Sequence, residues 1–213
     1  MIVLSIDTCG PSGSIALGSV EPDAVEVLVQ TELAGKTYSA QLVPVLRTML
    51  QKQQQEQGVD VSALDAIVVV NGPGSFTGIR IGVSSAKGLA AALDIPVLAV
   101  SRLAALAWKA QTHCSALDAG RSEFYFRDGN REFLLGAKNM PLTSIESTAV
   151  CEPTAERAFA NAVLVTPPNA SDAIRYSVPR LLACDFSDLE LLDGNYVRRS
   201  DAEIFAKVAG RPD

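Results

Sequence analysis

A continuous apolar run that passes directly into a glycine-rich loop places the strongest constraint on how this chain can fold. The run is Ala66–Val70 and the loop is Asn71–Gly78. Uninterrupted apolar residues over such a short stretch are typical of a strand covered on both faces, as in a parallel sheet. A helix is expected after the loop, from about Ile79 to Leu93. We therefore predict an α/β fold around a parallel central sheet.

The rest of the first half supplies further elements of such a fold. Alternating or short apolar runs between turn residues predict strands, and apolar positions three and four residues apart predict helices. The order is then βββαβαβα, and its first three strands are expected to form a meander. The predicted strands are Ile2–Ile6, Ser14–Leu17, Val25–Thr31 and Val97–Val100, and the further helices are Ser39 to about Gln57 and Ser101 to Trp108.

The second half begins again with strands, and the order βββαβα repeats. Asp7 and Asp118 each end the opening strand of their half, which indicates a duplicated architecture with an abbreviated second copy. We place the first lobe at residues 1–110 and a reduced second lobe with a C-terminal tail at 111–213. The expected elements are strands at Ser115–Asp118, Glu123–Arg127, Glu132–Leu135 and Val163–Thr166, with helices around Glu152–Ala160 and Val178–Ala183.

Composition excludes several classes of protein. Hydrophobic residues make up 48% and charged residues 20%, which is ordinary for a folded domain. The start has no basic region before its short apolar run, and charged residues interrupt the apolar stretch Ile79–Val100, so neither a signal peptide nor a membrane span is expected. We therefore predict a cytoplasmic protein that does not contact a membrane.

Cysteine spacing and net charge narrow the range of ligands. The four cysteines form no C-x-x-C pair, so they are expected to be small buried residues and no metal site is predicted. The formal net charge is −6 without a stripe of Lys or Arg, which argues against a large RNA-binding surface on this chain. His113 is the single histidine, so paired-histidine metal sites cannot form. No catalytic residue is assigned.

The glycine-rich segment Asn71–Gly88 is open to two interpretations. A turn that opens a helix exposes free N–H groups, which makes it an anion site in which Gly72, Gly74 and Ser75 would contact phosphate. Alternatively, its glycines and small residues allow another backbone to approach the helix closely. The segment is neither a Walker loop nor a dinucleotide fingerprint.

Asp7 and Asp118 are likewise open to two interpretations. If the lobes face each other, Asp7 and Asp118 would meet across one cleft and suit a hydrated Mg²⁺ on a nucleotide phosphate, with Thr8 beside them. Alternatively, each carboxylate caps its own turn. Both interpretations stay open at the level of sequence.

The stretch Gly72–Ala90, with the sequence GPGSFTGIRIGVSSAKGLA, closely resembles the signature of the TsaB (YeaZ) family. Four weaker matches lie in register with it, and together they span nearly the whole chain. They are Ile6-Asp-Thr8 before a Ser-x-Ala-Leu strand, Ser39-x-x-Leu-Val-Pro44, Asp118-Ala-Gly-Arg-Ser-Glu-Phe-Tyr125 and Tyr196-Val-Arg198. The chain departs from the family at Tyr38, where many relatives have His.

This resemblance implies an actin-like/hexokinase-like ATPase fold of the ribonuclease H-like kind. It also implies a non-catalytic subunit that forms a heterodimer with TsaD, the threonylcarbamoyltransferase that modifies the adenosine beside the anticodon in tRNAs reading codons that begin with A. The resemblance also implies that TsaE joins this chain and TsaD, and that this chain forms a homodimer when TsaD is absent. It further implies that this chain contacts tRNA only through the complex. No intrinsic cofactor is expected, and ATP or ADP with Mg²⁺ at the partner interface is left open.

In the family, two helices of the first lobe form the partner interface. By resemblance these are the helices at about Ser39–Gln57 and Ile79–Leu93. The alternative function is a weak ATPase or phosphotransferase with a nucleotide between the lobes. The candidate interface residues are Leu42, Val45, Leu46, Met49, Ile79, Gly82, Val83, Ala86 and Leu89.

Overall fold

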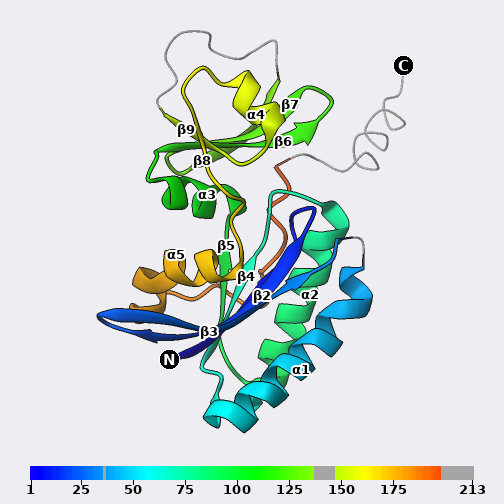
Figure 1. Ribbon diagram of the computed structural model, residues 1–213, viewed down its shortest axis with the longest axis vertical. Helices are drawn as coiled ribbons and strands as arrows, with labels where there is room; N and C mark the ends of the chain where they lie inside the picture. Colours follow the sequence, from blue (N-terminus) through cyan, green and yellow to red (C-terminus); the bar gives the residue numbers. More distant parts are fainter. Residues whose placement is uncertain (36, 137–146, 198–213) are drawn as a thin grey trace.

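The computed structural model describes residues 1–35, 37–136 and 147–197, and all structural statements concern these residues. Two five-stranded sheets form two lobes stacked along the long axis of the molecule, with the first lobe lower in Figure 1 and the second above it. The predicted C-terminal tail and Arg198 lie outside the described residues. The two-lobed α/β architecture is therefore as predicted.

The first sheet combines an antiparallel meander with a parallel half. Its strand order is β3-β2-β1-β4-β5, in which β1, β2 and β3 pair antiparallel and β4 and β5 continue parallel to β1. The run Ala66–Val70 is buried at every position, as a strand with covered faces requires. The strands are β1 (Ile2–Asp7), β2 (Gly13–Glu21), β3 (Ala24–Leu33), β4 (Ala66–Val70) and β5 (Val97–Val100).

The second sheet repeats the same plan. Its order is β8-β7-β6-β9-β10, so β6 takes the place of β1 and β9 takes the place of β4. β6, β7 and β8 pair antiparallel, whereas β9 is parallel to both β6 and β10. The predicted duplication is confirmed. The strands are β6 (Cys114–Gly120), β7 (Glu123–Asp128), β8 (Arg131–Gly136), β9 (Thr148–Val150) and β10 (Ala162–Leu164).

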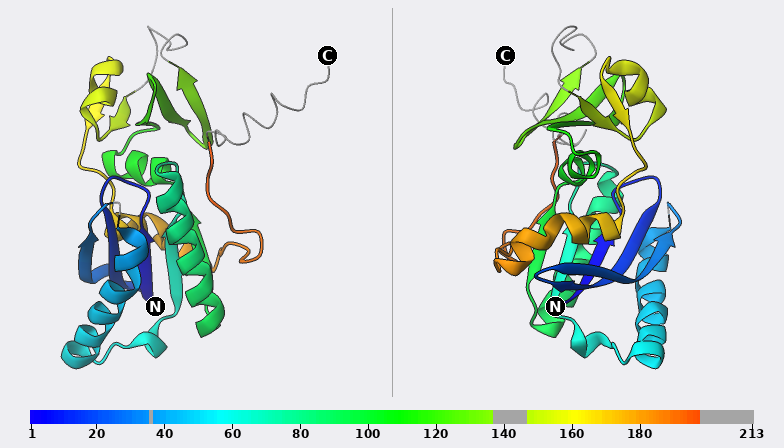
Figure 2. Two further views of the ribbon diagram at one scale, coloured as in Figure 1. Left: turned by 90° about the vertical axis from the view of Figure 1, so that its right-hand side faces the viewer. Right: turned by 60° about the vertical axis from the view of Figure 1, so that its left-hand side comes forward.

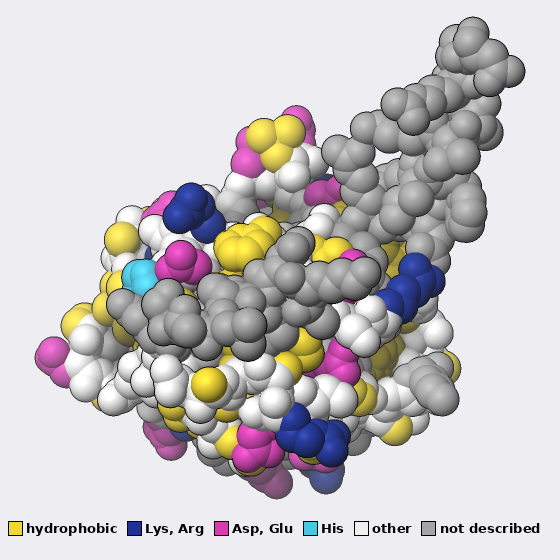
Figure 3. Space-filling model, turned by 90° about the horizontal axis from the view of Figure 1, so that it is seen from above, with side chains coloured by type: hydrophobic (Ala, Val, Ile, Leu, Met, Phe, Trp, Pro, Cys, Tyr) yellow, Lys and Arg dark blue, Asp and Glu magenta, His cyan; other side chains and the backbone are white. Residues whose placement is uncertain are grey.

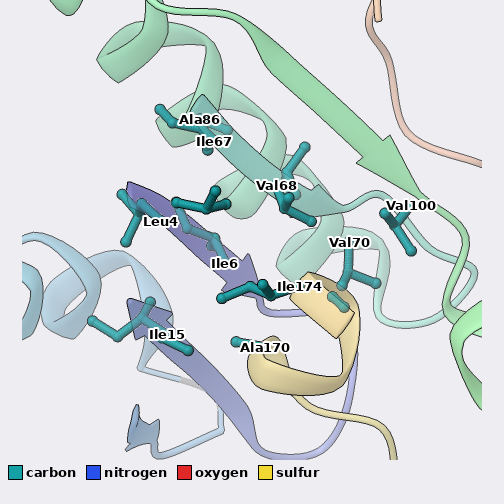
Figure 4. Close-up of a cluster of buried hydrophobic side chains, with 14 of the residues drawn as sticks. Leu4, Ile6, Ile15, Ile67, Val68, Val70, Ala86, Val100, Ala170 and Ile174 are labelled. Atoms are coloured by element: carbon teal, nitrogen blue, oxygen red, sulfur yellow. The ribbon is translucent and has the colours of Figure 1, made fainter. Parts of the chain in front are cut away.

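Helices cover both faces of the first sheet. α1 (Tyr38–Gln57) and α2 (Phe76–Leu93) lie on one face and α5 (Ala170–Leu182) on the other, as Figures 1 and 2 show. The side chains of the central strands β1 and β4 are consequently covered on both faces of the sheet. In Figure 4, Leu4 and Ile6 of β1 lie between Ala86 of α2 and Ile174 of α5. This large apolar cluster fixes the position of the strand ends.

The last helix of each lobe packs on the other lobe. α3 (Arg102–Ala110) follows the first sheet but contacts β6, β7 and β9, and its Leu103 and Leu106 share a cluster with Leu117 of β6. α5 follows the second sheet but packs on β1, β2 and β4. The predicted division at residue 110 therefore separates the two sheets, whereas α3 and α5 each pack on the sheet of the other lobe.

Several predicted elements differ in detail. α2 begins at Phe76 rather than Ile79, because the Ser75 hydroxyl accepts the N–H of Gly78 and caps the helix three residues earlier. β9 was not predicted, since three residues are too few for a periodic pattern. α5 begins at Ala170, well before Val178, behind a capping box formed by Asn169 and Asp172. α4 spans Pro153–Ala158.

Two surface expectations can be compared with the structure. Cys9 and Cys114 are buried as predicted, but Cys151 is half-buried and Cys184 is exposed, so the prediction was wrong for Cys184. On the end of the molecule viewed in Figure 3, Lys and Arg side chains are scattered among acidic ones. Across the described ranges, no helix is long and apolar enough to cross a bilayer.

Candidate functional site

The site begins at the turn between β1 and β2. Asp7 ends β1 and is 3% exposed, and its Oδ1 accepts the N–H of Cys9 at 2.8 Å. Burial raises the pKa of the Asp7 carboxyl above its ordinary value, although the nearby Arg102 guanidinium and the Cys9 hydrogen bond act in the opposite direction. Asp7 thus caps its own turn, which is one of its two predicted roles.

The glycine-rich segment packs directly on this turn. An added Cβ would lie 1.9 Å from the Thr8 carbonyl oxygen at Gly78, 2.5 Å from the Thr8 hydroxyl at Gly82 and 2.2 Å from the Cys9 carbonyl oxygen at Gly74. The Thr8 hydroxyl also donates to the Gly78 carbonyl at 2.6 Å. These glycines therefore serve the close-packing interpretation, because any side chain would push α2 off the β1–β2 turn.

Asp118 repeats the geometry of Asp7 in the second lobe. Its Oδ1 accepts the N–H of Gly120 at 2.6 Å, and its Oδ2 accepts the Thr154 hydroxyl at 2.7 Å. The backbone N–H of Asp118 donates to Glu152 Oε2 at 2.5 Å. The described residues contain no group of three or more His, Cys, Asp or Glu side chains placed to hold a metal ion. The turn-capping role is therefore the one observed at both aspartates.

A cleft of about 660 Å³ lies between the lobes and is lined by residues from both. The first lobe contributes the β1–β2 turn and the starts of α1, α2 and α3, and the second contributes the ends of β6 and β9. Among the predicted phosphate-contacting residues, Gly74, Ser75 and Asp118 line this cleft, while Asp7, Thr8 and Gly72 are buried. The structure thus brings together three of the six predicted residues at the cleft surface.

Arg102 lies at this cleft and was not predicted as a site residue. It is 5% exposed, and its Nε has no hydrogen-bond partner within the described part of the chain. Gly10 makes room for it, because a Cβ at that position would lie 2.8 Å from Arg102 Nη2. Burial disfavours the charged guanidinium, but the carboxylates of Asp7 and Glu152 raise its pKa above the ordinary value.

Sequence reasoning passed over Arg102 because it follows the cap Ser101 at the start of an apolar helix. The one available signal was a cation directly after the buried strand Val97–Val100, where a parallel sheet places its functional groups. Glu152 was missed in the same way, as the residue before a short helix. Burial raises the pKa of the Glu152 carboxyl, opposed by the Asp118 N–H and by Arg102.

Tyr38, the departure from the family pattern, has a structural role here. Its hydroxyl donates to the Gly10 carbonyl at 2.8 Å, and its ring lies against Gly13. Burial raises the pKa of Tyr38 to about 12. Tyr38 therefore ties the start of α1 to the β1–β2 turn. His113 lies outside the cleft and is exposed, with its Nε2 3.4 Å from Asp128 Oδ1.

Most of the candidate interface residues face the core. Val45 and Leu89 are partly exposed, and the remaining seven are buried. The apolar stripe of α1 packs on the sheet, so the outward surface consists of other residues, including Val43 of α1, which is 64% exposed, and Gly88 of α2. The seven buried residues are Leu42, Leu46, Met49, Ile79, Gly82, Val83 and Ala86.

Comparison with known proteins gives a consistent result. A family model described as TsaD, tRNA N6-adenosine threonylcarbamoyltransferase, matches residues 27–188. The chain is 32% identical over 138 residues to a tRNA threonylcarbamoyladenosine biosynthesis protein TsaB of Haemophilus influenzae, covering 62% of this chain and 55% of that protein. It is 36% identical over 152 residues to TsaB of Bacillus subtilis, covering 67% and 63%. The chain thus spans less than two thirds of these relatives.

Solved structures agree with the fold. YeaZ from Pseudomonas aeruginosa superposes with a TM-score of 0.73 at 25% identity, over 92% of this chain and 99% of that one. A second Pseudomonas aeruginosa structure, of an uncharacterized protein with similarity to the peptidase YEAZ, gives a TM-score of 0.74 at 24% identity. The predicted actin-like ATPase fold is therefore confirmed.

Proposed function

This chain belongs to the family of the TsaD model, and from that membership and its TsaB-like relatives we propose that it acts in tRNA threonylcarbamoyladenosine biosynthesis. Its role is that of a subunit that supports a TsaD-type transferase. In this role it contacts tRNA only through the complex, and a TsaE-type protein joins the assembly. It forms a homodimer when the transferase is absent.

The observation that carries the non-catalytic part of this proposal is the engagement of both strand-end carboxylates. Asp7 accepts from Cys9, and Asp118 accepts from Gly120 and Thr154, so each holds its own turn. A carboxylate used in this way has fewer lone pairs left to hold a hydrated cation or to remove a proton. This use of the aspartates favours a scaffold over an enzyme.

The partner surface in this proposal is the outward side of α1 and α2. Val43 exposes a large apolar side chain to solvent, and Ile81 and Leu89 are partly exposed on α2. Gly88 lies on the same helix, and no described residue comes within 4 Å of its Cβ position. Small residues at a helix surface let a second helix approach closely, and exposed apolar groups favour association.

The alternative remains a weak ATPase or phosphotransferase that binds ATP or ADP with Mg²⁺ between the lobes. The observation in its favour is the cleft itself, whose volume of about 660 Å³ lies in the range of small-molecule sites. In this role Ser75 and Thr77 at the start of α2 would contact phosphate. The crowding of Gly74 and Gly78 against Cys9 and Thr8 weighs against it.

Calorimetric titration distinguishes the two functions. We expect the full-length protein to bind the TsaD protein of its organism one to one, and to give no heat with ATP and Mg²⁺ alone. ATP binding without TsaD binding would instead support the enzyme and contradict the scaffold.

Variants locate the surface. Gly88→Trp adds bulk at an exposed site that is open in the chain itself, so it should weaken TsaD binding by about tenfold or more while the fold is kept. Gly136→Trp is the control, because a Cβ at Gly136 of β8 also meets no described residue within 4 Å and Gly136 lies in the second lobe. Equal binding by both variants would remove α2 from the interface.

A further inference from the structure

The two walls of the interlobe cleft carry opposite polarity. Three helices begin at the first-lobe wall, where Ser39 of α1, Ser75 before α2 and Arg102 of α3 line the space. Helix starts present unpaired N–H groups and partial positive charge, to which Arg102 adds a full charge. The second-lobe wall instead presents Asp118 and Glu152.

The Arg102 guanidinium is the group that points to a ligand. It is 95% buried, at 5% exposure, yet its Nε lacks a hydrogen-bond partner among the described residues. A buried donor without a partner destabilises the folded state, and more so when it is charged. Nε itself has no accessible surface, so an oxyanion in the cleft would contact the other guanidinium nitrogens, because a guanidinium matches the geometry of carboxylate oxygens.

The surrounding carboxylates restrict what else the ligand carries. The carboxylates of Asp7 and Glu152 interact with the Arg102 guanidinium, and an anion without a compensating cation would be repelled by them. Glu152 and Asp118 are linked by the hydrogen bond to Glu152 Oε2, which holds both at one wall. A cationic group at this wall would be attracted by both carboxylates and would donate hydrogen bonds to them.

We propose that the cleft binds a zwitterionic, amino-acid-like molecule, with its carboxylate toward Arg102 and the start of α2 and its ammonium toward Glu152 and Asp118. Such a ligand adds no net charge and provides an acceptor for the buried guanidinium of Arg102. The cleft is larger than the zwitterionic group alone, and Tyr38, Ile81 and Tyr125 line space for a side chain. The proposal goes beyond the scaffold function and does not depend on it.

A ligand series tests the two charges separately. The full-length protein is titrated calorimetrically with each of the twenty free L-amino acids, and those that bind are repeated as the N-acetyl and the C-terminal amide derivatives. The first derivative removes the ammonium and the second removes the carboxylate. We expect each derivative to bind about tenfold more weakly or worse than its parent.

Crossed variants assign each charge to its wall. Glu152→Gln keeps an acceptor for the Asp118 N–H but removes the charge, so it should lose the preference for the free ammonium while still requiring the carboxylate. Arg102→Met should lose the requirement for the carboxylate while still preferring the free ammonium, and Arg102→Lys should retain part of the affinity. Arg180→Met is the control, because Arg180 pairs with the exposed Asp185 outside the cleft lining.

Folding of each variant is checked by circular dichroism, and if Arg102→Met does not fold, Arg102→Lys and Glu152→Gln decide the question. Failure of every amino acid to bind the folded wild type would overturn the proposal. So would inorganic phosphate binding more tightly than any amino acid and equally well to Glu152→Gln, which would indicate an oxyanion site alone. TsaD binding is measured in parallel, so loss of the scaffold function would appear separately.

Discussion

The two lobes share one topology but differ in how their turns and helices are supported. Both sheets have the same strand order, and Asp7 and Asp118 accept the N–H two residues ahead in the same way. In the first lobe, however, the turn is packed under the glycines of α2, whereas a Cβ at Gly120 in the second lobe would meet no described residue within 4 Å. The same aspartate-to-backbone hydrogen bond therefore lies in a turn that α2 covers in the first lobe and in a more exposed turn in the second lobe.

The apolar cores follow the same contrast. One large cluster joins the first sheet to α1, α2 and α5, while the second sheet has two smaller clusters around Phe124 and Leu117. Each lobe also depends on a helix that follows the other sheet. The duplicated topology thus sets where the cleft lies, whereas the apolar core behind its first-lobe wall is larger than the clusters behind its second-lobe wall.

The largest expected effects test the crossing of the helices. Ile174→Ala removes a fully buried side chain of α5 and should cost about 2 to 5 kcal/mol of unfolding free energy. In this variant, amide hydrogen exchange should accelerate in β1 and β2, because α5 packs on these strands even though it follows the second sheet in the chain. Leu106→Ala on α3 is the counterpart and should affect β6 and β9. Acceleration confined to each helix's own preceding sheet would contradict the crossing.

Glycine substitutions test the difference between the turns. Gly78→Ala places a Cβ 1.9 Å from the Thr8 carbonyl oxygen, so we expect a loss near the upper end of about 1 to 3 kcal/mol for overpacking. The new Cβ of Gly120→Ala meets no atom of the described residues within 4 Å, but alanine must hold a φ of +71°, which costs about 1 kcal/mol. Gly88→Ala is the control within α2 and should stabilise the helix by about 0.5 to 1 kcal/mol. Urea denaturation measures all three, and equal losses would contradict the contrast.

A pH series tests the enclosure of Asp7. Burial raises the pKa of the Asp7 carboxyl above its ordinary value of 3.8, so the folded state favours the protonated form. The stability that the protonated carboxyl contributes is therefore lost as the pH rises from 3.8 through the raised pKa. Asp7→Asn cannot ionise, so it should gain stability relative to the wild type as the pH rises above 3.8, by about 1.4 kcal/mol for each unit of pKa shift. Asp118→Asn serves as the comparison in the second lobe. A constant difference between Asp7→Asn and the wild type would contradict this expectation.

The smallest expected effect concerns the link between α1 and the first turn. Tyr38→Phe removes the hydrogen bond to the Gly10 carbonyl and should cost about 1 kcal/mol. Ultraviolet titration of the wild type should show one tyrosine ionising near pH 12, absent from the variant, because burial raises the pKa of Tyr38 to about 12. An unchanged titration curve would show that Tyr38 is not enclosed in this way.

Much of the fold was predictable because local patterns encode it. The apolar run at Ala66–Val70 gave a buried parallel strand, and the spacing of Leu42, Leu46 and Met49 gave α1. Repetition of the strand order revealed the two lobes. Short elements such as Thr148–Val150 were missed, since three residues carry too little periodicity.

The site was less predictable. Glycine content allowed either an anion site or a close approach to α2, and it did not indicate that Thr8 and Cys9 make that approach. The apolar stripe of α1 marked burial without telling whether a sheet or a partner covers it, and most of the candidate interface residues lie in the core. Periodicity records that a side chain is covered, and it does not identify the covering group.

The sequence by itself determined the order of the elements, the duplication and the presence of two strand-end aspartates, because these follow from propensity and pattern over a few residues. Only the tertiary structure decided that α3 and α5 exchange lobes, that Arg102 is buried beside Asp7 and Glu152, and that the glycines enclose the first turn. These features join residues far apart in the chain. Their energies arise from burial and charge in three dimensions, which no local pattern records.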